Sequence, residues 1–393
     1  MNKSQIKYIY ILSALIYFCQ GIGGLVGQPL YYYLKETLGI SVGTVMMLMS
    51  LTSIPWMIKP IYGLLSDNVP IWGYKRKSYI ALSGLLSTIT CLFLGISPIL
   101  PIYLLFILMI VDSLGGAVKD VAIDGLMVEE GKKYNLAGKI QSVQWGSLTI
   151  ATILTGVGGG YIAEHFDYRF AYLLMSMFPL LIILFAFRYK EEKTERKKLK
   201  LLTVLKKYVG VFKNHQFLLS TLFLFLLWFS PSIGTPIFAK MRDELHLSKM
   251  WIGWLGTIGA ISSVLGAILY FKLGEKINLK KWLFIGTLVS GISTLAYLYL
   301  TATSVLVYNI LFGISGMFIN LIIMNFMAKA CPKGTEATTF ALLCSVVNFG
   351  GFLSGVVGGK LYNMMGYNGL VIISGVTTLI TLVFIPFLKV NKT

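Results

Sequence analysis

The chain has 393 residues, of which 56% are hydrophobic and only 13% are charged, and its mean hydropathy is +0.76. Soluble domains carry roughly 25% charged residues, so a soluble fold of this size would lack the polar groups to cover its surface. The net charge of +18 does not indicate nucleic-acid binding, because the basic residues lie in short loops between apolar runs. The composition therefore predicts an all-α integral membrane protein embedded in a lipid bilayer.

Apolar runs long enough to cross a bilayer, about 20 residues each, follow one another along the chain. We expect about twelve transmembrane helices, near residues 8–33, 42–65, 78–96, 100–127, 138–163, 169–188, 216–240, 250–273, 282–301, 304–328, 337–362 and 367–388. The first run lacks a small-residue cleavage site, so it is expected to be a span rather than a signal peptide. Pro231 and Pro236 predict a bend in the seventh span, because proline donates no helical hydrogen bond.

The loops differ in their content of lysine and arginine, which indicates the orientation. Every second connection is rich in basic residues, and both termini fall on the basic side. The basic side of a membrane protein faces the cytoplasm, so both termini are predicted to be cytoplasmic. The short N-terminus carries no organelle signal, and we expect the cell membrane, either a plasma membrane or a bacterial inner membrane.

Three blocks of sequence repeat in the same order in the two halves of the chain. GQPLYYYLKETLGIS from Gly27 matches GTPIFAKMRDELHLS, 207 residues on, and TGVGGGYI from Thr155 matches SGVVGGKL, 199 residues on. Gly115, Gly116 and Asp120 correspond, 200 residues on, to Ser315, Gly316 and Asn320. The blocks predict two six-helix halves, residues 1–188 and 216–393, joined by a cytoplasmic linker at 189–215. Parallel six-span repeats are typical of the major facilitator superfamily.

A loop motif follows the second span, in the stretch KPIYGLLSDNVPIWGYKRKSY from Lys59. Gly63, Asp67 and the basic cluster resemble a loop signature of that superfamily, in which Gly allows close helix contact and the charges form a cytoplasmic latch. The residues expected to form this cytoplasmic gate are Gly63, Asp67, Lys75, Arg76 and Lys77. The loop between Asp67 and the basic cluster is longer here than in that signature.

The same stretch resembles, more specifically, the folate–biopterin transporter family. Two further blocks carry the resemblance, KDVAIDGLMVEE at Lys119–Glu130 and GKIQSVQWGS at Gly138–Ser147. The resemblance implies a folate- or pterin-like solute, driven by a proton gradient. Superfamily membership implies alternating access around a midplane site, formed mainly by spans one, four, five, seven, ten and eleven. It also implies that a monomer suffices.

Charged residues at bilayer depth, away from the ends of the predicted spans, lie in the first half of the chain. They are Lys59, Asp112, Lys119, Asp120 and Asp124. A charge at bilayer depth costs roughly 2.5–3.5 kcal/mol, so each is expected to face a cavity or a partner. Asp112 and Lys119 share one face of a helix, and Asp120 and Asp124 share another. Span four is therefore expected to be buried among helices or to line the pathway.

These residues have two interpretations. For the solutes that the resemblance implies, Asp112 or Asp120 can accept both N–H groups of a pterin's guanidine-like edge. Lys59 and Lys119 are cations for a folate's carboxylates, and Asp120 and Asp124 are candidates for reversible protonation. The alternative for each residue is a structural ion pair between helices. Neutral candidates for solute contact are Gln20, Gln28, Gln141, Gln144, Trp145 and Asn320.

The sequence also bears on other classes of function. No phosphate-binding loop indicates ATP as an energy source, and no nucleophile–base arrangement, metal-ligand spacing or cofactor motif indicates an enzyme. The main alternative is a transporter of another small metabolite, such as a nucleoside-like compound, a sugar derivative or a peptide fragment. From other classes, an integral membrane enzyme would need clustered ligand residues, and a solute-sensing receptor would need a larger soluble domain than the longest polar stretch allows.

Overall fold

The computed structural model describes residues 3–98, 100–134, 136–195, 210–211, 213–273, 278–332 and 336–388. Most of these residues are helical, and they form two compact units. Unit 1 comprises Met1–Thr37, Ile58–Leu199 and Lys249–Thr257, and unit 2 comprises Leu38–Met57, Lys200–Ser248 and Ile258–Thr393. Most of the predicted linker, residues 196–209 and 212, lies outside the described residues.

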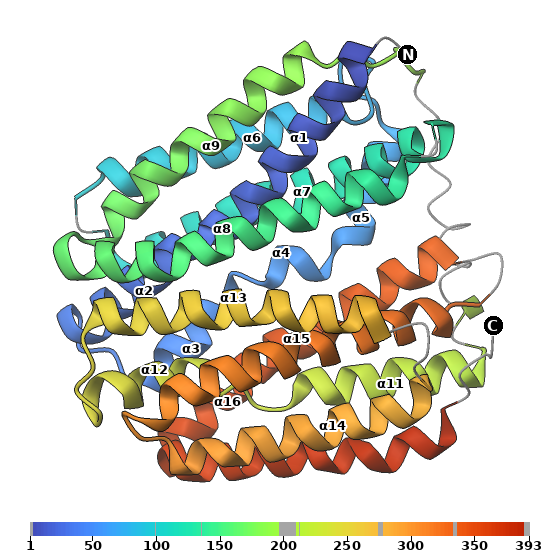
Figure 1. The fold of residues 1–393 in the computed structure, drawn as a ribbon. Helices are drawn as coiled ribbons and strands as arrows, with labels where there is room; N and C mark the ends of the chain where they lie inside the picture. The colour runs from blue at the N-terminus through green and yellow to red at the C-terminus, as the bar shows by residue number, and fades with distance from the viewer. Residues whose placement is uncertain are drawn as a thin grey trace. The chain divides into compact units, whose positions relative to one another are not determined.

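Unit 1 is a bundle of long helices. Its elements are α1 (Lys3–Ile22), η1 (Gly23–Val26), α2 (Gly27–Tyr32), η2 (Tyr33–Thr37), α5 (Lys59–Asn68), α6 (Lys77–Ile96), α7 (Ile102–Tyr134), α8 (Ala137–His165), α9 (Tyr168–Arg188) and the first turns of α13 (Lys249–Leu273). α1 lies against α8 and α9, while α6 lies between α9 and α7 (Figure 1). α7 contacts α1, α5, α6 and α8, as expected for a span that carries four charged residues.

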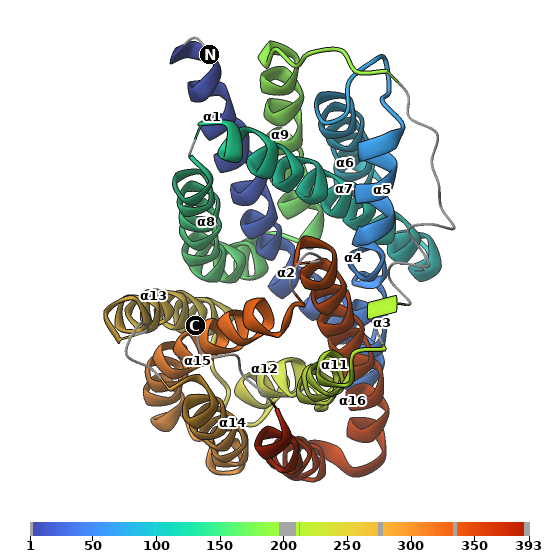
Figure 2. The same ribbon diagram turned by 90° about the vertical axis from the view of Figure 1, so that its right-hand side faces the viewer.

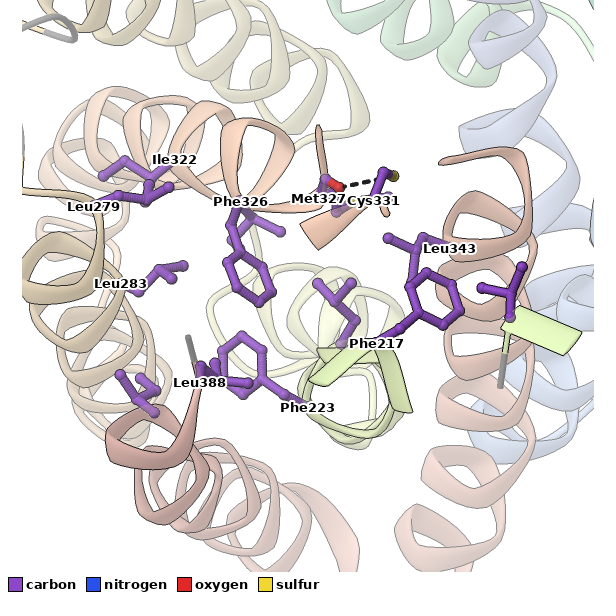
Figure 3. Packing of buried hydrophobic residues seen from close by; sticks show 14 residues of the cluster. Phe217, Phe223, Leu279, Leu283, Ile322, Phe326, Met327, Cys331, Leu343 and Leu388 are labelled. Carbon is purple, nitrogen blue, oxygen red and sulfur yellow. Dashed lines mark hydrogen bonds between the residues drawn. The ribbon is translucent and has the colours of Figure 1, made fainter. Parts of the chain in front are cut away.

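Unit 2 contains the remaining helices. They are α3 (Val42–Leu51), α4 (Ile54–Met57), α11 (His215–Phe229), α12 (Gly234–Asp243), the rest of α13, α14 (Leu279–Ala296), η4 (Tyr297–Tyr299), α15 (Ser304–Ala330), α16 (Glu336–Ile380) and η5 (Thr381–Phe387). α16 contacts both α11 and α14, and Figure 2 shows these helices grouped in one bundle. Their core is mostly aliphatic but includes aromatic rings: those of Phe223 and Phe326 meet edge to face with centroids 5.7 Å apart (Figure 3).

Breaks in two of the spans occur where the sequence places prolines. The second span is divided into α3, α4 and α5, and Pro55 and Pro60 lie at the starts of the two later pieces. The seventh span is divided at Ser230–Ile233, which confirms the bend predicted from Pro231 and Pro236. Backbone groups freed by a break must find other partners inside a membrane. Here Ser354 Oγ donates to the Ser230 carbonyl at 2.6 Å, and the Ser232 N–H donates to the Ser354 carbonyl.

The number of spans agrees with the sequence once these breaks are considered. Ten described helices are long and apolar enough to cross a membrane. The divided second span is not among them, and Thr339–Phe387 contains two predicted spans that meet at Gly366, whose φ is 69°. A positive φ suits glycine because it lacks a Cβ, so Gly366 permits the turn between the eleventh and twelfth spans.

Candidate solute-binding and coupling site

Lys59 and Asp120 form an ion pair in the interior of unit 1. The Lys59 Nζ lies 2.5 Å from Asp120 Oδ2, and the side chains are 24% and 7% exposed. Gln20 on α1 donates from Nε2 to the other carboxylate oxygen at 2.6 Å. Lys59 reaches this position because the second span breaks just before it, which makes it the first residue of α5. Asp120 is thus buried among helices of unit 1, as expected for a charge in this span.

Asp124 lies one helical turn beyond Asp120 and has a different set of partners. The Tyr17 hydroxyl donates to Asp124 Oδ1 at 2.8 Å, and Gln144 Nε2 donates to the same oxygen at 3.3 Å. Both donors are neutral, and within the described residues no lysine or arginine forms an ion pair with Asp124 at hydrogen-bonding distance. Lys59 balances the charge of Asp120, so the group as a whole carries an excess negative charge whenever both carboxyls are ionised.

Asp112 and Lys119 belong to a separate polar cluster, between α7 and α6. Lys119 is only 3% exposed, and its Nζ donates to Ser87 Oγ at 2.7 Å. Ser87 in turn donates to Asp112, and Cys91 Sγ lies 3.6 Å from Asp112 Oδ1. Asp112 and Lys119 are seven residues apart, roughly 10 Å along the helix axis, which is too far for direct contact. The structure connects them through the hydroxyl of Ser87.

The remaining predicted contacts do not join either cluster through a hydrogen bond. Gln28, on α2, is 8% exposed, and its Oε1 has no hydrogen-bond partner among the described residues. Trp145 is 42% exposed and meets the Tyr17 ring edge on, with centroids 6.3 Å apart. Gln141 is exposed on α8, and Asn320 belongs to α15 in unit 2. Solute contact by these four residues stays a prediction.

At the end of α5, two of the five predicted gate residues, Asp67 and Arg76, form an ion network, whereas the Lys77 ammonium donates to the Phe187 and Tyr189 carbonyls. The Arg76 guanidinium contacts Asp67 and Ser66 Oγ, and it lies 2.7 Å from Glu129 Oε1 on α7. Burial works to lower the pKa of Arg76, but hydrogen bonds and charge attraction from Glu129 and Asp67 outweigh it and raise the pKa above its ordinary value. The guanidinium therefore stays charged while holding α5 and α7 together.

The long loop between Asp67 and Arg76 folds back on itself. Ile71 and Tyr74 exchange both backbone hydrogen bonds around Trp72 and Gly73, whose φ angles are 54° and 83°. Two positive φ angles in succession are typical of the tight type I′ turn. The turn compensates for the extra residues of this loop, so that Arg76 reaches Asp67.

Several partners of the predicted residues were missing from the sequence analysis, among them Tyr17, Ser87 and Glu191. Tyr17 lies three residues before Gln20 on the same face of α1, and this spacing is a signal that could have found it. Ser87 gave no signal, because a serine in an apolar span is common. Glu191, which accepts from the backbone N–H groups of Lys75, Arg76 and Lys77, is more than 100 residues away along the chain.

Comparison with known families accounts for these sequence features. The model of the BT1 family matches residues 20–390. The chain belongs to the BT1 family. A folate-biopterin transporter of Synechocystis is 31% identical over 98% of this chain and 82% of its own length. Folate transporter 1 of Plasmodium falciparum is 24% identical over 88% of this chain and 70% of its own length. The resemblance to folate–biopterin transporters is thereby confirmed, and this BT1 family member is a multi-pass membrane transporter rather than an enzyme.

Solved structures confirm the fold of this BT1 family member. Nucleoside transporter NupG superposes with a TM-score of 0.77 at 15% identity, covering 100% of this chain and 100% of its own. A D-xylose–proton symporter superposes with a TM-score of 0.76 at 14% identity, covering 97% of each chain. The chain therefore has the major facilitator fold predicted from its repeats.

Proposed function

We propose that this protein is a secondary active transporter that moves folate- or pterin-like solutes by alternating access, coupled to protons. The observation that carries the proposal is the pair of carboxylates on α7, of which Asp120 is balanced by Lys59 and Asp124 is not. The names of its relatives support the solute class, since they include folate-biopterin and folate transporters. The basic connections in the sequence support cytoplasmic termini.

The partners of the two carboxylates suggest different roles, with solute binding at Asp120 and proton uptake at Asp124. A pterin's guanidine-like edge is a forked donor and can replace Lys59 on Asp120, in the way that arginine binds a carboxylate. Once displaced from Asp120, the Lys59 ammonium can attract a carboxylate of a folate. Asp124, which is part-buried and held by neutral donors, is the group for which protonation removes a charge that no ion pair balances. Proton uptake at Asp124 and solute binding at Asp120 would thus act on neighbouring groups.

The proposal is tested by uptake of labelled folate and of a simple pterin into proteoliposomes, with and without an inward proton gradient. We expect gradient-stimulated uptake by the wild type. Asp124→Asn should retain solute exchange and lose the response to the gradient. Asp120→Asn should weaken solute binding by about ten- to a hundredfold, because hydrogen bonds to a charged group are lost.

Asp167→Asn is the matched control, because this carboxylate is exposed and pairs with Arg169 at the start of α9. It should transport like the wild type. Folded wild-type protein that moves neither compound would refute the solute class. Gradient-driven uptake by Asp124→Asn at the wild-type rate would refute the coupling role.

A further inference from the structure

Within unit 1, the first turns of α13 approach α8 as closely as backbones can. A Cβ added to Gly156 would lie 2.4 Å from the Thr257 backbone nitrogen, and one added to Gly253 would lie 2.6 Å from the Gly156 carbonyl oxygen. Only glycine permits such an approach. We call this contact of α8 with α13 the first seam.

The Thr257 side chain bridges one hydrogen-bonding pair of α8 across the first seam. Its Oγ1 donates to the Ile153 carbonyl at 2.7 Å and accepts from the Val157 N–H at 2.9 Å. Ile153 and Val157 are four residues apart, so they are the acceptor and the donor of a single α-helical bond. Thr257 is 5% exposed, so this bridge is buried.

Unit 2 contains a similar contact, in which the glycines on α16 are the repeat equivalents of those on α8. There α3 meets α16, and a Cβ on Gly359 would lie 2.2 Å from the Gly43 carbonyl oxygen. Gly156 and Gly160 of the first seam correspond to Gly355 and Gly359, 199 residues on. We call this contact of α3 with α16 the second seam.

The repeat also relates the two hydroxyls, because Ser50 and Thr257 are 207 residues apart. Ser50 approaches α16 so closely that a Cβ on Gly355 would lie 1.8 Å from its Oγ. Yet Ser50 Oγ donates at 2.7 Å to the carbonyl of Met46, which is in its own helix. Met46 corresponds to Gly253 at the same offset. Equivalent hydroxyls on equivalent seams therefore make two different bonds, one within the helix and one across to its neighbour.

We infer that Thr257 and Ser50 are switch residues of the transport cycle, each alternating between a bond to its own helix and a bridge into the neighbouring helix. The inference rests on the alternating-access cycle proposed above. When the two helices of a seam move relative to each other, a buried backbone group must keep a hydrogen-bond partner. A Ser or Thr hydroxyl avoids that loss because it can bond the carbonyl four residues before it in its own helix. In the opposite state, Thr257 bonds the Gly253 carbonyl, and Ser50 bridges Phe352 and Val356.

Hydrogen–deuterium exchange of the purified full-length protein tests the inference without any solute. Thr257→Val keeps the size of the side chain and removes the hydroxyl, whereas Thr257→Ser keeps the hydroxyl. We expect the amides of residues 153–160 to exchange on the order of fivefold faster in Thr257→Val, as for the loss of one hydrogen bond. Thr257→Ser should match the wild type. Equal exchange in the valine variant, or an equal defect in the serine variant, would overturn the role of the hydroxyl.

Ser50→Ala tests the second seam and serves if Thr257→Val does not fold. Because Ser50 bonds its own helix in the structure, this variant should leave exchange at residues 352–356 unchanged while slowing solute turnover at unchanged affinity. Turnover at the wild-type rate would overturn its part in the switch. If the wild type transports neither folate nor a pterin but the exchange results hold, the solute proposal fails and the bridge made by Thr257 stands.

Discussion

At the scale of residues, unit 1 carries two buried polar clusters that differ in their balance of charge. Asp112 and Lys119 are opposite charges connected by one hydroxyl, and neither depends on a solute to be neutralised. The cluster of Lys59, Asp120 and Asp124 holds two carboxyls for one ammonium. This difference favours a structural role for the first cluster and a transport role for the second.

The first cluster leads to a prediction about stability. Lys119→Met leaves the Asp112 carboxylate without its cation, and loss of one partner from a buried pair costs about 3–5 kcal/mol. Thermal unfolding in detergent should show a much lower midpoint for this variant. Adding Asp112→Asn should restore most of the loss. A Lys119→Met variant as stable as the wild type would contradict the structural role. An altered solute affinity in the stable double variant would instead favour solute contact by this cluster.

The charged residues of the site could be predicted from the sequence, because an ionisable group inside an apolar span is rare and costly. Their partners could not. Whether Lys59 pairs with Asp112, Asp120 or Asp124 depends on how α5 is rotated after the break in the second span. The role of Ser87 could not be predicted either, because it arises only where α6 packs against α7.

At the scale of elements, the N-terminus of α6 depends on a residue that follows α9. Glu191 Oε1 accepts from the Lys75 N–H at 2.8 Å, and Oε2 accepts from the Lys77 N–H at 2.7 Å. The first N–H groups of a helix have no partners within it, and a carboxylate also interacts favourably with the helix dipole. The beginning of the inter-half linker is thereby attached to the loop that carries Arg76.

Glu191→Ala should therefore destabilise the start of α6 by about 1–2 kcal/mol, the usual cost of losing a capping side chain. The amides of residues 75–78 should exchange faster with deuterium, and the midpoint of thermal unfolding should fall. Glu192→Ala is the matched control, because its side chain is exposed and it is the neighbouring residue of the same type. Equal effects of the two substitutions would show that Glu191 does not cap α6.

At the scale of the whole molecule, the units are not the two sequence halves. α3 and α4, from the first half, belong to unit 2, and the first turns of α13, from the second half, belong to unit 1. The repeat predicted the two halves and their equivalent glycines. It could not predict that each unit includes helical segments from the other half. Contacts across a seam depend on the shape of the helices at the glycines rather than on hydropathy. The expected division at 189–215 stays a prediction about the sequence repeat.

The first turns of α13 belong to unit 1 and are attached there by charged side chains at the end of the first seam. The Lys249 Nζ lies 2.7 Å from Glu36 Oε2, with side chains 19% and 35% exposed. Glu164 Oε2 on α8 accepts from the Met250 N–H at 2.8 Å, close to the positive end of the α13 dipole. Lys249 thus connects the end of the first span to the eighth, beside a carboxylate of the fifth.

Lys249→Glu should weaken this attachment, because it brings a third carboxylate beside Glu36 and Glu164. We expect faster deuterium exchange in residues 249–257 and slower solute turnover, and both effects should shrink at high salt because exposed charges are screened. Reversing the pair with Glu36→Lys should recover part of the loss, with a coupling energy of about 1 kcal/mol in the double-mutant cycle. Zero coupling would mean that Lys249 acts through its contact with the Tyr32 ring, 4.5 Å away, rather than through Glu36.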